Sequence, residues 1–197
     1  MNLRKHRVLS ILLTLALALS LAVPALAAEG PFPDVSASHW AADEIAAAAE
    51  AGLFQGDENG RFQPEASLTR AAFVTVLCRM FGWETVSPAE PSYSDCAPGD
   101  WYYAAVETAA AHGAGSGSGA FRPNDAITRR EIAVLLIQAL GYESLAAEAV
   151  STGMTSPFAD VNRSDPDGGS ILVAYQIGLT NGVAQGDRLL FQPDDTA

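Results

Sequence analysis

Residues 121–141 have the sequence FRPNDAITRREIAVLLIQALG and are the most informative stretch of this chain. Thr128 stands where a helix N-cap is expected, and Glu131 completes the pattern of a capping box. Apolar residues then recur with helical spacing along one face: Ile132, Leu135, Leu136, Ala139 and Leu140. Gly141 follows as a helix terminator. The stretch therefore predicts a short amphipathic helix that is entered through a Pro-Asn-Asp turn.

Two arginines occupy the first turn of this predicted helix. Arg129 and Arg130 lie where the helix dipole disfavours positive charge. A residue that breaks a local rule is a candidate for function. A guanidinium beside the free amides of a helix start could bind a carboxylate or a similar anion. The alternative is structural, because Arg129 could instead pair with a nearby aspartate and hold two segments together.

The same pattern occurs earlier, at residues 62–82, which have the sequence FQPEASLTRAAFVTVLCRMFG. Thr69 and Arg70 take the places of the Thr-Arg pair of the later helix, and the apolar spacing is retained. Ala72 replaces the glutamate of the capping box, so we expect a weaker cap in this copy. Two copies of an unusual helix start indicate a repeat rather than chance.

Both helices belong to a longer unit that occurs three times. Each copy opens with an aromatic residue followed two positions later by an aspartate: Asp34, Asp95 and Asp160. A tryptophan stands six residues after the aspartate in the first two copies (Trp40 and Trp101), and a proline takes its place in the third. A helical segment, a Gly-rich turn and a Phe-x-Pro sequence then lead to the signature helix. The repeat predicts an all-α fold of tandem helix–loop–helix units at 31–82, 92–141 and 157–197.

The third copy is incomplete within this sequence. In the earlier copies the Thr-Arg pair begins seven residues after the phenylalanine, and in the third copy that position would follow Ala197. Either the sequence is a piece of a longer protein or the third repeat is defective. Between the second and third copies, residues 143–150 have the composition of a further helical turn.

Individual marks of the repeat leave alternatives open. Trp40 and Trp101 are either core residues or platforms for a sugar ring. We expect the repeat aspartates to cap the segments that follow them or to pair with arginine, rather than to bind a ligand. Cys78 and Cys96 are either two small hydrophobic residues or, since secretion permits it, the partners of a disulfide.

Residues 1–27 form a predicted secretory signal peptide. The first seven residues are basic, residues 8–23 are almost wholly apolar, and Ala25-Leu26-Ala27 has the pattern of a cleavage site. The apolar run is shorter than the ~20 residues that a membrane span needs. No other stretch has the composition of a span, so we expect none after signal cleavage.

The charge and motif content exclude several classes of function. The formal net charge is −12, all acidic residues follow the leader, and every basic residue after it is arginine. Nucleic acid is an improbable partner because it requires a basic face. The sequence lacks a nucleophile elbow, a phosphate loop, and calcium or zinc spacings, so we expect no enzyme, cofactor or metal site. A glycosidase-like pair of carboxylates is the remaining enzymatic alternative.

Together these marks resemble the S-layer homology domain, whose repeat carries F-x-D-V, a tryptophan, a Gly-rich turn, F-x-P and an I-T-R-A-E helix start. Residues 127–131 (ITRRE) and 68–72 (LTRAA) are close matches. The resemblance covers nearly all of the chain after the leader. It implies tandem units packed with pseudo-threefold symmetry in a mostly helical fold, the third being incomplete here.

The resemblance also implies a function. The family anchors exported proteins non-covalently to the bacterial cell wall by binding a secondary cell-wall polysaccharide, often one with pyruvate ketals. Carried over by position, the residues at the inter-repeat grooves would be Arg70, Arg129, Thr69, Thr128, Trp40, Trp101 and Glu131. The third copy lacks the tryptophan and, within this sequence, the arginine, so a third groove is not expected.

We therefore expect a secreted, non-enzymatic module at the cell wall or S-layer. Its partner would be a polysaccharide linked to peptidoglycan, and a cargo domain would lie beyond residue 197. The alternative is a structural repeat protein that self-associates or binds a protein partner, with its arginines as internal staples. A small glycan hydrolase is a weaker third reading.

Overall fold

The computed structural model describes residues 30–115, 118–162 and 164–197 of the 197-residue chain. The predicted signal peptide at 1–27 lies outside these residues. The chain divides into two compact units, one ending at Pro64 and the other running from Glu65 to Ala197, and each is described by itself.

The smaller unit is built around one helix, α2 (Ala42–Glu50). Its core consists of residues from the opening of the first copy and from α2: Phe32, Val35, Ala41 and Ile45. The ring of Phe62 packs against those of Phe32 and Phe54, with centroid distances of 5.3 and 5.2 Å. The Phe-x-Pro sequence of the copy is thereby held against the opening of the copy.

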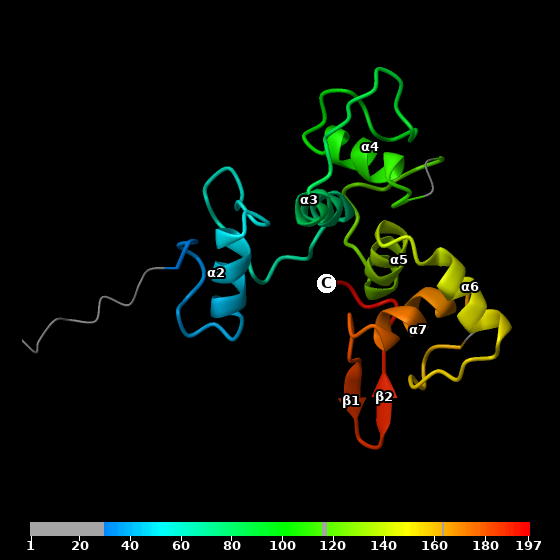
Figure 1. The fold of residues 1–197 in the computed structure, drawn as a ribbon. Helices are drawn as coiled ribbons and strands as arrows, with labels where there is room; N and C mark the ends of the chain where they lie inside the picture. Colours follow the sequence, from blue (N-terminus) through cyan, green and yellow to red (C-terminus); the bar gives the residue numbers. More distant parts are fainter. Residues whose placement is uncertain (1–29, 116–117, 163) are drawn as a thin grey trace, which may run out of the picture. The chain divides into compact units, whose positions relative to one another are not determined.

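The larger unit is mostly helical, and its two strands form one short hairpin (Figure 1). Its elements are α3 (Arg70–Phe81), α4 (Tyr103–Ala111), α5 (Arg129–Ala139), α6 (Glu143–Ser151), α7 (Gly168–Gln176), β1 (Val183–Gln185) and β2 (Arg188–Leu190). The strands pair antiparallel. The predicted all-α fold is confirmed, and the helical turn expected near residue 143 is a complete helix, α6.

The two signature helices, α3 and α5, begin as predicted. The hydroxyl of Thr69 accepts a hydrogen bond from the amide of Ala72, at 3.2 Å. Thr128 and Glu131 form a complete capping box, in which each side chain accepts from the other residue's amide. The Thr residues are therefore the N-caps, and only the second copy has the reciprocal bond that the sequence predicts for it.

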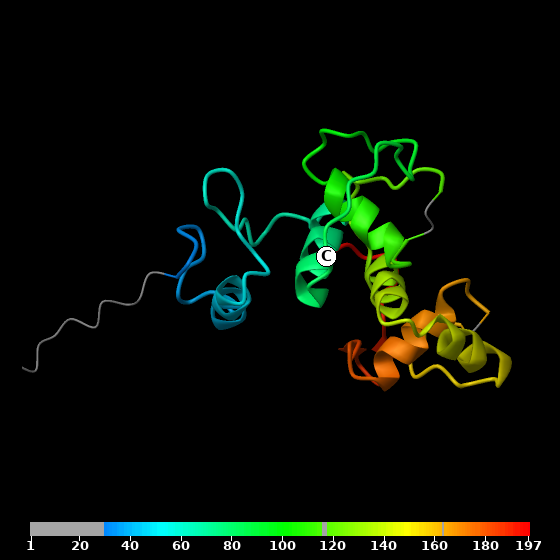
Figure 2. The same cartoon turned by 45° about the horizontal axis from the view of Figure 1, so that its top comes forward.

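The helices of the larger unit pack in two groups, α3 with α4 and α5 with α6 and α7 (Figure 2), and each group contributes to its own hydrophobic core. The first joins α3 and α4 through fully buried side chains such as Leu77, Val106 and Phe121. The second joins α5, α6 and α7. Helices α6 and α7 approach so closely that a Cβ atom on Gly169 would lie 2.2 Å from the carbonyl oxygen of Ala146. Only glycine fits at that crossing.

In every copy, the repeat aspartate joins the opening of the copy to its Phe-x-Pro turn. Its two carboxylate oxygens accept hydrogen bonds from two consecutive amides, which we call the aspartate clasp. The clasps are Asp34 with Phe62 and Gln63, Asp95 with Phe121 and Arg122, and Asp160 with Phe191 and Gln192. The second residue of each pair has a left-handed backbone, with φ values of 59°, 60° and 58°. The clasp thus holds a conformation that non-glycine residues rarely adopt, and the aspartates have the structural role expected of them.

Equivalent residues of the three copies meet in a closed ring of backbone hydrogen bonds. The amide of Leu68 donates to the carbonyl of Ala197 at 2.8 Å, and the amide of Ile127 donates to that of Leu68 at 2.8 Å. The amide of Ala197 donates to Ile127 at 3.0 Å and closes the ring. Each residue directly precedes the Thr position of its copy. The three backbone segments are thus related cyclically at the point where they meet.

The disulfide considered between Cys78 and Cys96 is absent, because both cysteines are free thiols. They pack in the core around α3 and α4, where Cys96 is buried and Cys78 is partly buried. Burial raises the pKa of each thiol to about 11, and for Cys96 nearby carboxylates such as Asp95 act in the same direction. The two residues therefore serve as small hydrophobic side chains. Among the described residues, no single helix is long and apolar enough to cross a membrane.

The aspartate clasp generates a prediction about stability. We expect Asp95→Ala to lower the free energy of unfolding by about 1–3 kcal/mol, because two charge-assisted hydrogen bonds are lost and the left-handed residue Arg122 is left unheld. Urea unfolding followed by circular dichroism measures this change. Glu84→Ala, which removes an exposed carboxylate from the connector, is the matched control and should change stability little. Equal stability of the two variants would contradict a structural role for the clasp.

The same clasp predicts sensitivity to acid. Burial acts to raise the pKa of Asp95, but the amides of Phe121 and Arg122 outweigh it and hold the pKa below the ordinary value of 3.8. Since the folded pKa is depressed, the stabilisation is complete above pH 3.8 and is lost as the pH falls through the lower folded value. The difference between the urea midpoints of wild type and Asp95→Ala should therefore be largest near neutrality and should decrease as the pH falls below 3.8.

The two thiols generate a third prediction. With a pKa of about 11, only about one thiol in a thousand is ionised at pH 8, so native protein should react slowly with a thiol-specific disulfide reagent. In denaturant both cysteines should react at once. Failure to detect two thiols per denatured chain would show that a disulfide forms.

Candidate functional site: two arginine junctions

The first arginine junction consists of Arg70, Phe121 and Glu131. Arg70 reaches from the start of α3 to the Phe-x-Pro turn of the second copy, where its Nε donates to the carbonyl oxygen of Phe121 at 2.8 Å. The guanidinium lies over the ring of Phe121, 4.9 Å from the centroid. Its Nη1 lies 2.9 Å from Glu131 Oε1. The arginine is therefore held by a carbonyl, a ring and a carboxylate.

The second arginine junction consists of Arg129 and Phe191 and repeats this geometry one copy later. Arg129 Nε donates to the carbonyl oxygen of Phe191 at 2.7 Å, and the guanidinium lies 5.1 Å from the centroid of its ring. The position that corresponds to Glu131 would follow Ala197. No ion pair to Arg129 occurs in the described part of the chain.

A small cleft accompanies the second junction. It has a volume of about 110 Å³ and is lined by Arg129 together with apolar residues of α5, by Ala174 of α7, and by Leu179, Thr180 and Phe191. Thr180 supplies a hydroxyl to this lining. A charged fork and a hydroxyl on apolar walls are suited to a small anionic group.

The helix-start amides do not contribute to either junction, which corrects the sequence-based expectation of a socket made from them. At α3, the amides of Arg70 and Ala71 donate to the carbonyls of Asp125 and Pro123, both at 3.0 Å. At α5, the amides of Arg129 and Arg130 donate to Asp195 and Pro193, both at 2.9 Å. The turn of the next copy thus occupies these donors, and the guanidinium groups are the remaining cationic donors at each junction.

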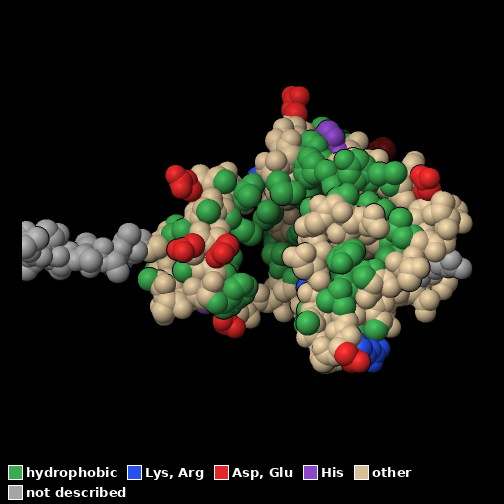
Figure 3. Space-filling view, turned by 60° about the horizontal axis from the view of Figure 1, so that its bottom comes forward, with side chains coloured by type: hydrophobic (Ala, Val, Ile, Leu, Met, Phe, Trp, Pro, Cys, Tyr) green, Lys and Arg blue, Asp and Glu red, His purple; other side chains and the backbone are tan. Residues whose placement is uncertain are grey.

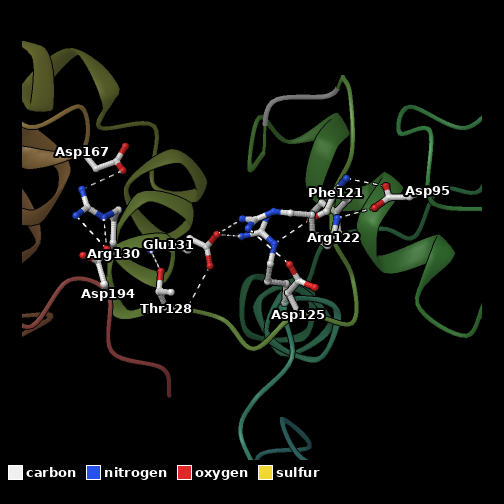
Figure 4. Close-up of polar contacts among 10 residues, drawn as sticks. Asp95, Phe121, Arg122, Asp125, Thr128, Arg130, Glu131, Asp167 and Asp194 are labelled. Atoms are coloured by element: carbon white, nitrogen blue, oxygen red, sulfur yellow. Dashed lines mark hydrogen bonds and ion pairs between the residues drawn. The ribbon is translucent and has the colours of Figure 1, made fainter.

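Glu131 connects helix capping with charge neutralisation (Figure 4). One of its oxygens accepts from the amide of Thr128, and the other binds Arg70 and Arg122. Burial acts to raise the pKa of Glu131, but the Thr128 amide and the two guanidinium groups together lower it. The carboxylate therefore remains ionised and offsets the positive charge of the first junction.

Carboxylates near the second junction bind the neighbouring arginine instead. Arg130 donates through Nε and Nη2 to Asp194 at 3.2 Å, and its Nη1 lies 3.7 Å from Asp167 (Figure 4). The two arginines of the odd helix start thus have different roles. Arg130 joins two copies through ion pairs, whereas Arg129 contacts the next copy through the carbonyl and ring of Phe191 and forms no ion pair with any described residue.

Trp40 and Trp101 are not core residues, so the interpretation that places them in the core is wrong. Trp40 is 89% exposed and Trp101 is 67% exposed. Trp40 belongs to the smaller unit, and Trp101 lies just before α4 in the larger one. Trp101 is not among the residues that line the cleft beside Arg129. The third tryptophan, Trp83, is stacked between Phe81 and His112 and fastens a connector.

Sequence reasoning missed the contacts that define both junctions. The phenylalanines of the Phe-x-Pro sequences were noted as marks, yet their carbonyls and rings are the partners of the arginines. The constant spacing between Phe-x-Pro and Thr-Arg could have suggested a contact between copies. Thr180 lies in the Gly-rich turn, where nothing in the sequence distinguished it.

Positive charge is sparse on the face of the larger unit that Figure 3 draws. On the face drawn in Figure 3, hydrophobic and uncharged side chains cover most of the larger unit, and Lys and Arg side chains appear only in small spots. With a formal net charge of −12, the protein repels anions at long range. Recognition of an anion must therefore occur at contact distance, where screening by salt is weak.

Comparison with known proteins finds a matching family model and several similar surface proteins. The family model described as the S-layer homology domain matches residues 31–74 and 92–133. The chain is 38% identical over 130 residues to the S-layer protein sap of Bacillus anthracis, which covers 64% of this chain and 16% of that protein. It is 30% identical over 177 residues to the surface-layer 125 kDa protein of Lysinibacillus sphaericus, and this match covers 89% of this chain and 14% of that protein.

A protein named as an enzyme also contains a segment that is similar to this chain. The chain is 32% identical over 155 residues to an amylopullulanase of Thermoanaerobacterium thermosulfurigenes, and this match covers 77% of this chain and 8% of that protein. The chain thus spans about a sixth or less of the length of these relatives. Two matched repeat segments, the capped Thr-Arg helices and the similarity to surface-layer proteins together show that the chain belongs to the S-layer homology domain family.

Proposed function

We propose that this chain anchors a secreted protein to the bacterial cell wall by binding an acidic wall polysaccharide non-covalently, with Arg129 as the principal contact. The observation that carries the proposal is the second arginine junction. Its guanidinium is held in place, lacks an ion pair in the described part of the chain, and lines a cleft with a hydroxyl.

The comparisons support the general role. S-layer homology repeats and relatives described as surface-layer proteins indicate a secreted protein of the cell surface. The same segment occurs in an S-layer protein and in an amylopullulanase, of which it forms a small part. A module shared by proteins with such different names is suited to attachment rather than to catalysis. The polysaccharide as ligand and the residues that contact it belong to our proposal.

The geometry favours a carboxylate as the recognised group. The bond from Nε to Phe191 and the contact with its ring fix the plane of the guanidinium, so little conformational entropy is lost on binding. A fixed guanidinium can donate two parallel hydrogen bonds to a carboxylate. A volume of about 110 Å³ is too small for a whole sugar ring, since typical ligand pockets have 300 Å³ or more. The cleft thus fits an acidic substituent, such as a pyruvate ketal, whose sugar remains outside.

The first junction should contribute less. Arg70 is paired with Glu131, whose carboxylate also binds Arg122. A polysaccharide carboxylate would have to compete with this pair and would meet its negative charge. We therefore assign Arg70 and Glu131 a secondary part in binding. Thr69 and Thr128 contribute as caps that hold the helix starts.

The exposed tryptophans extend the proposal to the sugar rings. A solvent-exposed indole offers an apolar, electron-rich face of the kind that stacks on a sugar, and leaving it in water has no structural benefit. Trp40 and Trp101 occupy the same position in two copies. We assign them to contacts with the polysaccharide outside the small cleft.

Residues 157–197 are, on this proposal, a third repeat that is incomplete in this sequence. The clasp of Asp160 and the contact of Arg129 with Phe191 support it, because they reproduce those of the second copy. The limits 31–82 and 92–141 for the first two repeats, the signal peptide at 1–27 and a cargo domain beyond residue 197 also remain predictions.

A structural role for the arginines is the second candidate. Both Nε atoms donate to a carbonyl of the following copy, as a staple would. In that case the repeats would serve self-association or a protein partner. The two candidates differ in what the rest of each guanidinium does, and the two junctions allow them to be separated.

The decisive comparison is Arg129→Gln against Arg70→Gln. Both variants remove the same staple, but only Arg129→Gln removes a guanidinium that has no ion pair in the described structure. We expect Arg129→Gln to lower the affinity for purified cell-wall polysaccharide at least about tenfold, and Arg70→Gln to lower it less than about threefold. Co-sedimentation with wall sacculi and calorimetry with the released polymer measure both.

Two outcomes would contradict the assignment. Equal loss of affinity in both variants, with equal loss of stability, would favour the staple. Full binding by the double variant would remove the arginines from the site altogether. Addition of salt from 50 to 500 mM should weaken binding by wild type more than residual binding by Arg129→Gln.

The tryptophans generate a separate test. Binding of the polysaccharide should protect Trp40 and Trp101 from acrylamide quenching, while the stacked Trp83 changes little. Replacing both exposed tryptophans with alanine should weaken binding about tenfold without loss of thermal stability, since neither is buried. Unchanged affinity of that variant would remove them from the contact surface.

A further inference from the structure

Helix α4 differs from its counterparts in the other two copies at three buried positions. The positions hold Tyr103, Glu107 and Thr108 in α4, where α2 has three alanines and α7 has Gly168, Leu172 and Val173. All three side chains of α4 are at most 2% exposed. Burying polar groups where the repeat tolerates apolar ones is costly unless they have partners. This helix therefore has a role that its counterparts lack.

The three side chains fix the connector that precedes the second copy. The Tyr103 hydroxyl donates to the carbonyl of Pro88 at 2.8 Å, and the amide of Val86 donates to Thr108 Oγ1 at 2.9 Å. Glu107 accepts from both the amide and the hydroxyl of Ser92, at 2.8 and 2.6 Å. The connector is thus attached to α4 at three points along its length.

A cleft of about 640 Å³ lies between this connector and α4. Its apolar lining comes from Val86 and Pro88 of the connector and from two alanines of α4, Ala110 and Ala111. Its polar lining comes from Ser87, Ser92 and Glu107. Because the connector is hydrogen-bonded to α4 at three points, the cleft is largely formed before any ligand binds.

The carboxylate in this cleft has no cationic partner. Within the described structure, Glu107 forms hydrogen bonds with Ser92 and takes part in no ion pair. Residues 83–115 contain five acidic side chains and no lysine or arginine. An ionised carboxylate has about four acceptor sites, and Ser92 fills two of them. A buried carboxyl group with free acceptor sites, in a segment without lysine or arginine, favours a cationic ligand.

The lining distinguishes an ammonium group from a metal ion. Among the described residues, no group of three or more His, Cys, Asp or Glu side chains could hold a metal. Calcium requires six to eight oxygen ligands, and one carboxylate with two serines does not supply them. An ammonium group needs only a few acceptors, and the apolar walls fit a hydrocarbon stem.

We propose that the cleft between residues 86–92 and α4 binds a primary ammonium group on a short aliphatic stem, with Glu107 as the anionic partner. The site is separate from the arginine junctions and selects the opposite charge. It gives the chain a second recognition point for an amine-bearing component of its surroundings. The arginine variants should therefore leave it unchanged.

The test uses n-butylammonium as the probe and 1-butanol as its neutral match. On the wild-type chain, n-butylammonium should produce saturable amide shifts at Val86, Ala110 and Ala111 in nitrogen–proton correlation spectra, whereas butanol should not. Glu107→Gln retains an acceptor and a donor for Ser92 but lacks the charge, and it should weaken binding at least tenfold. Glu90→Gln, an exposed change on the same connector, should bind as wild type does.

The proposal is overturned if butanol and butylammonium shift the same amides equally, or if Glu107→Gln binds as well as wild type. Should Glu107→Gln fail to fold, the comparison of the two probes on the wild-type chain still decides. Arg129→Gln should retain the butylammonium shifts whatever its effect on polysaccharide binding, so the two proposals fail independently.

Discussion

The arrangement of this protein depends on one repeated interaction, a carboxylate that accepts hydrogen bonds from two consecutive amides. Asp95 and Asp160 fix the backbone at Phe121 and Phe191, and those residues in turn present a carbonyl and a ring to Arg70 and Arg129. Without the clasp, the left-handed residue after each phenylalanine would relax, and the arginine would lose its support. In the second and third copies, therefore, an aspartate at the start of the copy supports the turn that holds an arginine of the preceding copy.

Much of the fold could be predicted because the repeat is regular. The N-caps, the capping box of α5 and the all-α class follow from local chemistry that the sequence displays openly. The partners of Arg70 could not be predicted, since its first contact is a backbone carbonyl 51 residues away, and any residue has a carbonyl. The exposure of Trp101 was equally hidden, because an aromatic residue at a repeat mark is compatible with the core and with the surface. Among the described residues of the other copies, hairpin β1–β2 has no counterpart that could have indicated it.

The candidate site shows how one residue type can serve structure and recognition together. The Nε atom of each arginine stabilises the fold by donating to a backbone carbonyl, and the two Nη atoms can bind other partners. In the first junction, Glu131 forms an ion pair with Arg70. In the second, no described residue forms an ion pair with Arg129, which lines the cleft. A protein of formal net charge −12 can in this way retain a local preference for an anion. It does so by surrounding a cation with apolar walls rather than by building a basic surface.

The ring formed by Leu68, Ile127 and Ala197 has a mechanical consequence. Each of the three residues both donates to one neighbour and accepts from the other, so no bond in the cycle is terminal. Tension applied at any one of them is transmitted to the backbones that lead into α3 and α5 rather than to a single strand end. Rupture by peeling, in which bonds fail one after another from a free edge, has no starting point in a closed cycle. The junction is thereby suited to bearing load.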